Sequence, residues 1–175
     1  MNIWHDIEPN RICPNDFMVV IEIPKGGKSK YELDKTTGFL RLDRILHTST
    51  HYPANYGFIP RTYAQDFDPM DVLVVSSEVI APLTLVRCYP IGVITMIDSG
   101  MNDEKIIAIP FSDPAYNTYT DVKQLPKHRF DEMMHFFSVY KNLEEKDIEV
   151  GEVKNAKIAQ KIVKDSIDSY RENFC

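Results

Sequence analysis

The sequence is poor in cysteine and in long apolar runs, and each shortage excludes a class of protein. Its three cysteines lie far apart and form no C-x-x-C pair, so neither a disulfide framework nor a zinc site is indicated. The apolar stretch 72–86 is interrupted by Glu78 and Pro82, and residues 1–10 carry ionisable side chains where a signal peptide would be apolar. We therefore expect no contact with a membrane and a cytoplasmic location.

Positive charge is also scarce. The chain has 20 Lys and Arg against 26 Asp and Glu, a net charge of -6. A protein with this net negative charge does not attract nucleic acid or an anionic membrane surface, so we expect no nucleic-acid partner. An anionic ligand would require a local basic cluster or a bridging cation.

The chain is long enough for one domain with a substantial core. It has 175 residues, of which 43% are hydrophobic, and it shows no repeat, low-complexity tract or flexible linker. We therefore expect a single domain over residues 1–175.

Strands are expected in the first two thirds of the chain. Residues 35–38, "KTTG", have the composition of a hairpin turn. The expected strands cover residues 17–24, 30–34, 39–46, 71–75, 86–98 and 104–110. They predict a β barrel or a curled sheet.

Two long helices are expected near the end of the chain. Apolar side chains recur at helical spacing in residues 127–144 and 155–174, and Asn155 is a candidate N-cap. The apolar positions are Phe130, Met133, Met134, Phe137 and Tyr140, then Ile158, Ile162, Ile167, Tyr170 and Phe174. The fold class is therefore α+β, mainly β, with two flanking helices.

The stretch 65–75, "QDFDPMDVLVV", places Asp66, Asp68 and Asp71 within six positions and without a Lys or Arg between them. Two carboxylates about 4 Å apart repel by about 4 kcal/mol at an effective dielectric of about 20. A solvated acidic turn is one interpretation, because Asp-Pro favours turns. The spacing excludes an EF-hand, and no His or Cys suggests a transition metal. A Mg²⁺ site is the other interpretation, because Mg²⁺ takes carboxylate oxygens, water and phosphate.

Further charged side chains fall at the ends of the expected strands and in the first long helix. Each one alone is more often a solvated surface residue than a ligand. The carboxylates are Glu22, Glu32, Asp98 and Asp103, and the basic or phenolic residues are Lys30, Arg44, Lys105, Tyr140 and Lys141. Such an alternation is what a site for both cations and phosphate requires.

Residues 65–75 resemble the D-x-D-P-x-D signature of the soluble family I inorganic pyrophosphatases of the bacterial type. Further segments match that family in the same order and spacing, so the resemblance covers nearly the whole chain. They are "VVIEIPKGGKSKYELDK", "LRLDRIL", "HYPANYGFIP", "VRCYPIGVITMID", "DEKIIAIP" and "HFFSVYKNLEEKDIEV". The resemblance implies a five-stranded barrel related to the OB-fold, an active site at its mouth, and a homohexamer.

The resemblance also implies a role for each matching residue. Asp66, Asp71 and Asp103 look like ligands of the tightest metal, with Asp71 bridging to a second. Asp98, Asp103, Glu22 and Glu32 resemble the ligands of metals that arrive with substrate. Asp68 looks like the base beside the attacking water. The residues that resemble the pyrophosphate contacts of the family are Lys30, Arg44, Tyr56, Lys105, Tyr140 and Lys141.

Three positions depart from the family pattern. Phe67 stands where a small or polar residue is usual, and Ser99 stands where an acidic residue is common. Of two histidines often found on the first long helix, this chain has His135 but Val139 at the second position.

We predict Mg²⁺-dependent hydrolysis of pyrophosphate to two phosphates. Bound cations would attract the anionic substrate and activate a water, and a carboxylate would accept the proton. The rival hypothesis is a non-catalytic OB-type module that binds oligonucleotides, which the net charge of -6 opposes.

Overall fold

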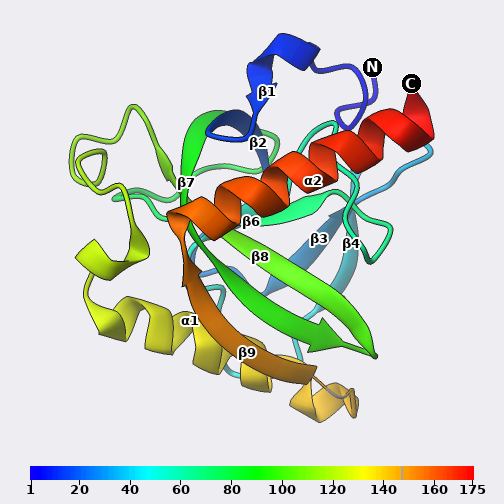
Figure 1. Cartoon of the computed structure of the whole chain (residues 1–175). Helices are drawn as coiled ribbons and strands as arrows, with labels where there is room; N and C mark the ends of the chain where they lie inside the picture. The colour runs from blue at the N-terminus through cyan, green and yellow to red at the C-terminus, as the bar shows by residue number, and fades with distance from the viewer. Residues whose placement is uncertain (147) are drawn as a thin grey trace.

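The structure, a computed structural model, describes residues 1–146 and 148–175. Strands dominate the chain up to Pro110, and two long helices follow (Figure 1). The strands are β1 (Ile12–Cys13), β2 (Asp16–Ile23), β3 (Ser29–Leu33), β4 (Leu40–Ile45), β5 (Asn55–Ile59), β6 (Met70–Val74), β7 (Leu85–Asp98), β8 (Met101–Pro110) and β9 (Ile148–Asn155). The helices are α1 (Lys127–Val139) and α2 (Ala156–Phe174), with short 3-10 turns η1 (Pro9–Arg11), η2 (Val122–Gln124) and η3 (Asn142–Glu144).

Five of these strands form a closed but uneven ring. The sheet runs in the order β1-β2-β5-β6-β8-β7-β9, and an additional β2–β7 pairing closes it. All neighbours are antiparallel except β6 and β8, which are parallel. The mainly β class with two helices is therefore confirmed.

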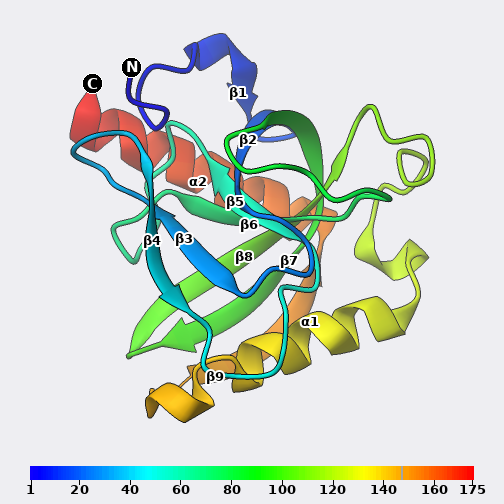
Figure 2. The same ribbon diagram turned by 180° about the vertical axis from the view of Figure 1, so that it is seen from behind.

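The hairpin of β3 and β4 lies outside the ring as a separate two-stranded sheet (Figure 2). Its turn is the expected one: the Asp34 N–H donates to the Phe39 carbonyl, and the Gly38 N–H donates to the Asp34 carbonyl, both at 2.8 Å. Gly38 has φ +76°, a left-handed conformation that glycine adopts without the steric cost of a Cβ.

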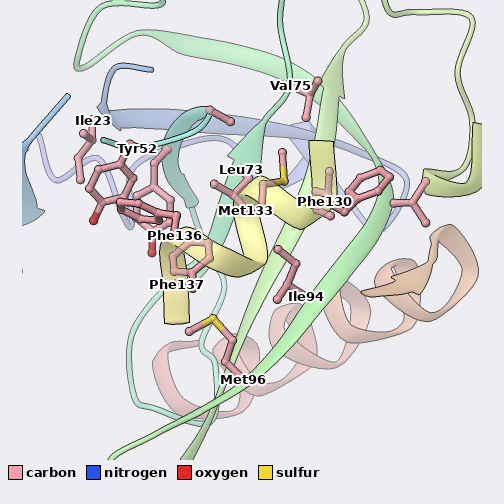
Figure 3. Packing of buried hydrophobic residues seen from close by; sticks show 14 of the residues in the cluster. Ile23, Tyr52, Leu73, Val75, Ile94, Met96, Phe130, Met133, Phe136 and Phe137 are labelled. Carbon is pink, nitrogen blue, oxygen red and sulfur yellow. The ribbon is translucent and has the colours of Figure 1, made fainter. Parts of the chain in front are cut away.

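Alternate residues of the ring strands face two hydrophobic clusters. On β6, Leu73 faces the cluster that includes α1, whereas Val72 faces the cluster that includes α2. Figure 3 shows Phe130, Met133, Phe136 and Phe137 of α1 packed beside Leu73 and Ile94. This alternation follows from the two-residue period of a strand, and it fixes both helices on the ring.

Three strands were not expected from the sequence, the short β1 together with β5 and β9, and the first long helix is shorter than expected. It ends at Val139, and η3 follows it, with Glu145 left-handed at φ +55°. The second long helix begins as expected, because the Asn155 side chain accepts a hydrogen bond from the Ile158 N–H at 3.1 Å.

The prediction of the apolar stripe on the second helix is partly wrong. Ile158 and Phe174 are exposed, whereas Ala159 and Val163 are fully buried. The reason is that small side chains let the helix approach the sheet closely, and the larger ones lie at the margins of this contact. Within the described residues, no helix is long and apolar enough to cross a membrane.

Candidate active site

Three carboxylates meet at one end of the strand ring. The parallel strands β6 and β8 place Asp71 opposite Lys105, and Asp103 precedes Lys105 by two positions on β8. Asp66 comes from the loop between β5 and β6. One oxygen of each carboxylate of Asp66, Asp71 and Asp103 lies within 4.8 Å of the others.

The ammonium of Lys105 lies between two of these carboxylates. Its Nζ is 2.5 Å from Asp71 Oδ2 and 2.7 Å from Asp103 Oδ1, and the residue is only 3% exposed. Burial acts to lower the pKa of Lys105, but the carboxylates of Asp103 and Asp71 outweigh it and raise the pKa well above its usual value. Lys105 therefore keeps its charge and partly neutralises the cluster.

The cluster remains too acidic for its surroundings. Burial, followed by the charges of Asp71 and Asp103, raises the pKa of Asp66 to about 7. Burial also raises the pKa of Asp71 against the opposing charge of Lys105, and burial together with Asp71 raises the pKa of Glu22. Raised carboxylate pKa values mean that the ionised cluster lacks positive charge. Binding of a further cation therefore stabilises the site.

A cavity of about 560 Å³ opens above the three carboxylates. Every predicted site residue except Arg44 lines it. The lining includes Glu22, Lys30, Glu32, Tyr56, Asp66, Asp68, Asp71, Asp98, Asp103, Lys105, Tyr140 and Lys141. Residues separated by more than 100 positions in the chain are thus gathered in one cavity.

The hairpin forms one wall of the cavity. Lys30 makes an ion pair with Glu32, and Arg41 of β4 contacts the same carboxylate at 3.3 Å. Glu22 of β2 is tied to the hairpin because its Oε1 accepts the Leu33 N–H at 3.0 Å.

The segment between α1 and η3 contributes another part of the lining. Lys141 makes an ion pair with Asp98 at the end of β7. Burial acts to raise the pKa of Asp98, but the hydrogen bonds from Lys141 and Ser99 and the Lys141 charge outweigh it and lower the pKa. The Ser99 hydroxyl bonds Asp98 Oδ1 at 3.0 Å, so the unusual serine at this position holds the neighbouring carboxylate.

Arg44 lies beside the cavity and does not line it. Its guanidinium contacts Asp43 at 2.5 Å and Glu144 at 2.6 Å. Glu144 belongs to η3, and no sequence pattern predicts that η3 lies next to the hairpin.

Sequence reasoning missed several residues of the lining, among them Lys35, Arg41 and Tyr52. Arg41 could have been found, because in the hairpin register it stands opposite Glu32. Lys35 lies in the predicted hairpin turn and follows Lys30 and Glu32, so the turn itself was a signal. Tyr52 is 2% exposed and lies between β4 and β5, outside every expected strand, so nothing local indicated it.

Phe67, the unusual residue between the first two aspartates, is left-handed with φ +67°. Its ring is 61% exposed and lies 6.1 Å from the ring of Tyr63. The loop thus adopts a conformation that favours glycine even though a bulky residue occupies it.

The three carboxylates of Asp66, Asp71 and Asp103 fit a hard divalent cation. Their ligand atoms are oxygens only, and the group contains no His or Cys that would favour zinc or copper. Lysine side chains from three parts of the fold surround them in the cavity. Fold and site together define an enzyme that binds an anionic substrate along with cations.

Comparisons with known proteins identify the family. The family described as inorganic pyrophosphatase matches residues 19–171. Soluble inorganic pyrophosphatase 2 of Chlamydomonas reinhardtii is 48% identical over 171 residues, which are 98% of this chain and 89% of that protein. This chain belongs to the inorganic pyrophosphatase family, whose members are hydrolases, so the resemblance seen in the sequence is confirmed.

Solved structures agree with this assignment. The inorganic pyrophosphatase of Helicobacter pylori is 40% identical with a TM-score of 0.88, covering 91% of this chain and 96% of that one. That of Thermus thermophilus is 32% identical with a TM-score of 0.89, covering 98% and 99%. The closed strand ring with two helices is therefore the fold of this family.

Proposed function

We propose that this chain hydrolyses inorganic pyrophosphate to two phosphates with Mg²⁺ as its cation. The observation that carries the proposal is the cluster of Asp66, Asp71 and Asp103, whose oxygens lie within 4.8 Å of one another at the floor of the cavity. We assign the tightest metal to these three residues. Asp71 lies on β6 within the strand ring, and we assign it as the bridge to a second metal.

The remaining carboxylates would hold metals that enter with substrate. Asp98, Asp103, Glu22 and Glu32 line the same cavity. Glu22 supports this assignment because its raised pKa reflects a buried carboxylate that lacks enough positive charge.

Bound Mg²⁺ would supply a water of lowered pKa and offset charge on the phosphates. The protein supplies the proton acceptor: we assign this role to Asp68, whose side chain lies at the cavity rim and is half exposed. The protein also orients the substrate through basic and phenolic side chains. These are Lys30, Arg44, Tyr56, Lys105, Tyr140 and Lys141.

Each of the three cavity lysines in this set is paired with a carboxylate. Lys30 pairs with Glu32, Lys105 with Asp71 and Asp103, and Lys141 with Asp98. When those carboxylates are engaged by cations, the ammonium groups can bind phosphate oxygens through charge-assisted hydrogen bonds. The same ion pairs thus hold the lysine side chains at the cavity until substrate and cations bind.

We further propose a single domain over residues 1–175, an OB-type barrel formed by the strand ring, a homohexamer and a cytoplasmic location. The family match over residues 19–171 supports the first two. The rival hypothesis of a non-catalytic oligonucleotide-binding module loses its basis, because an acidic cavity repels nucleic acid and the family is enzymatic.

Phosphate release from pyrophosphate, with and without Mg²⁺, tests the proposal. Asp71→Asn should abolish release and weaken Mg²⁺ binding in calorimetry, because one carboxylate serves two cations.

Asp68→Asn should lower turnover by about 10² to 10⁴ with nearly unchanged Mg²⁺ affinity, because only the proton acceptor is lost. Recovery of Asp68→Asn at high Mg²⁺ would make Asp68 a metal ligand and not the base.

A further inference from the structure

Lys35 joins three segments of the chain at the rim of the cavity. It stands in the turn between β3 and β4, and its ammonium makes an ion pair with the carboxylate of Asp68. The same Nζ donates to the Phe67 carbonyl at 3.1 Å and lies 5.8 Å from the ring centre of Trp4. Its own carbonyl accepts a hydrogen bond from the Asn2 side chain at 3.0 Å.

The turn that carries Lys35 is held by its neighbours. The Asp34 carboxylate accepts the N–H groups of Thr36 at 3.0 Å and Thr37 at 2.9 Å. Gly38 packs against the N-terminal segment so closely that a Cβ there would lie 3.0 Å from the Asn2 Cα. Lys35 therefore extends toward the acidic loop from a fixed base.

The acidic loop is closed on itself by backbone hydrogen bonds. The Ala64 N–H donates to the Asp68 carbonyl at 2.8 Å, and the Phe67 N–H donates to the Ala64 carbonyl at 3.1 Å. These bonds fix the backbone at Asp68 but leave its carboxylate at the surface. In residues 1–146 and 148–175, Lys35 is the one cation that pairs with this carboxylate.

We propose that Lys35 is a positioning residue that orients the Asp68 carboxylate and holds the hairpin against the acidic loop. The proposal rests on the assigned role of Asp68 as proton acceptor. Because the hairpin also carries Lys30 and Glu32, the Lys35 contact sets the distance between the hairpin wall and the cluster of Asp66, Asp71 and Asp103.

The exposure of the Lys35–Asp68 ion pair allows a positioning role to be distinguished from a contribution to folding stability. The side chains of Lys35 and Asp68 are 45% and 52% exposed, and ion pairs between exposed side chains contribute little to folding stability. Loss of Lys35 should therefore leave the melting temperature nearly unchanged while it affects turnover.

The test compares Lys35→Met, Lys35→Arg and Lys161→Met. The control Lys161 makes an exposed ion pair with Asp165 on α2, away from the cavity. We expect kcat to fall about 10-fold in Lys35→Met, with KM and resting Mg²⁺ affinity within 2-fold of the parent, and Lys35→Arg to recover most of the rate. Amide hydrogen exchange at residues 34–38 and 66–68 should become faster in Lys35→Met alone.

A double-mutant cycle tests whether Lys35 acts through Asp68. If it does, Lys35→Met should change kcat less than 2-fold when Asp68→Asn is already present. An undiminished 10-fold loss in that background, or full kcat in Lys35→Met alone, would overturn the positioning role. Near-parental turnover of Asp68→Asn would instead overturn the proton-acceptor assignment, so the two failures are distinguishable.

Discussion

At the scale of single residues, the carboxylate of Asp66 serves the site at a cost in folding stability. Its pKa of about 7 lies above the usual value of 3.8, so the folded protein holds a proton there that the unfolded chain releases. The stabilisation from this proton is fully present below about pH 4 and is lost as the pH rises through 7. Without metal, ionised Asp66 therefore opposes folding at neutral pH.

Asp66→Asn should consequently stabilise the metal-free protein at pH 8, by about 1 to 2 kcal/mol, less than the full shift because water reaches the side chain. The gain should nearly vanish below pH 4, where the carboxyl is protonated in both states. Thermal unfolding with a chelator at pH 4 and pH 8 measures this, and Asp131→Asn on the exposed face of α1 is the matched control. A variant less stable than the parent at pH 8 would contradict the prediction.

The residue types of the site could be predicted from the sequence, but the partners of those residues could not. Asp66, Asp68 and Asp71 are neighbours in the chain, so their crowding is visible without a structure. Arg44 and Glu144 are 100 positions apart, and their contact depends on how the hairpin and the end of α1 pack. For this reason Arg44 was expected in the cavity lining, whereas the structure places it beside the cavity.

At the scale of elements, β5 shows why part of the sheet escaped prediction. Its Asn55 and Gly57 disfavour strands locally, yet Asn55 is fully buried. The Asn55 amide is satisfied by three backbone groups, those of Lys25, Glu78 and Ile80, at 2.9 to 3.0 Å. β9 was missed because its glutamates and its lysine obscure the alternation of apolar and polar residues that is typical of a strand. Tertiary packing, and not local preference, makes both segments strands.

Gly57 is required by the close approach of β2. A Cβ at this position would collide with the Val20 carbonyl. Gly57→Ala should lower the free energy of unfolding by about 1 to 3 kcal/mol, the usual cost of overpacking. Because Tyr56 is adjacent and lines the cavity, we also expect a higher KM.

Urea unfolding measures this effect, with Gly100→Ala as the comparison. Gly100 has φ +81° and open space around it, so that variant shows backbone strain alone, about 1 kcal/mol. Equal losses in the two variants would argue against a collision at Gly57.

The contact of Arg44 with Glu144 joins the hairpin to the end of α1 and allows a second element-scale prediction. Arg44→Ala should raise KM about 10- to 100-fold, because a hydrogen bond to a charged group contributes about 1.5 to 3 kcal/mol. Glu144→Gln, which leaves the guanidinium in place, should raise KM less than about 3-fold. Steady-state kinetics with phosphate as product inhibitor measure both. Equal effects of the two variants would show that Arg44 serves only to hold η3.

At the scale of the whole molecule, exposed apolar side chains support assembly. Phe39, Leu42 and Ile45 on or beside β4 are 72%, 56% and 51% exposed, and Leu143 of η3 is 69% exposed. Contiguous apolar patches mark surfaces that other proteins cover, and the Arg44–Glu144 contact brings the β4 and η3 segments together. They support the proposed homohexamer.

The hexamer should be insensitive to pH between 5 and 8. His135 is exposed on α1, and Val139 lies one helical turn further along the same face, at the position where the resemblance noted in the sequence implies a second histidine. Histidine changes charge in this pH range and valine does not, so a single histidine per subunit brings less repulsion into an interface on this face as the pH falls. We expect light scattering to give the same mass at pH 5 and pH 8, whereas Val139→His should release smaller species at pH 5. A monomer at every pH would contradict the hexamer, and dissociation of the parent chain at pH 5 would contradict its pH resistance.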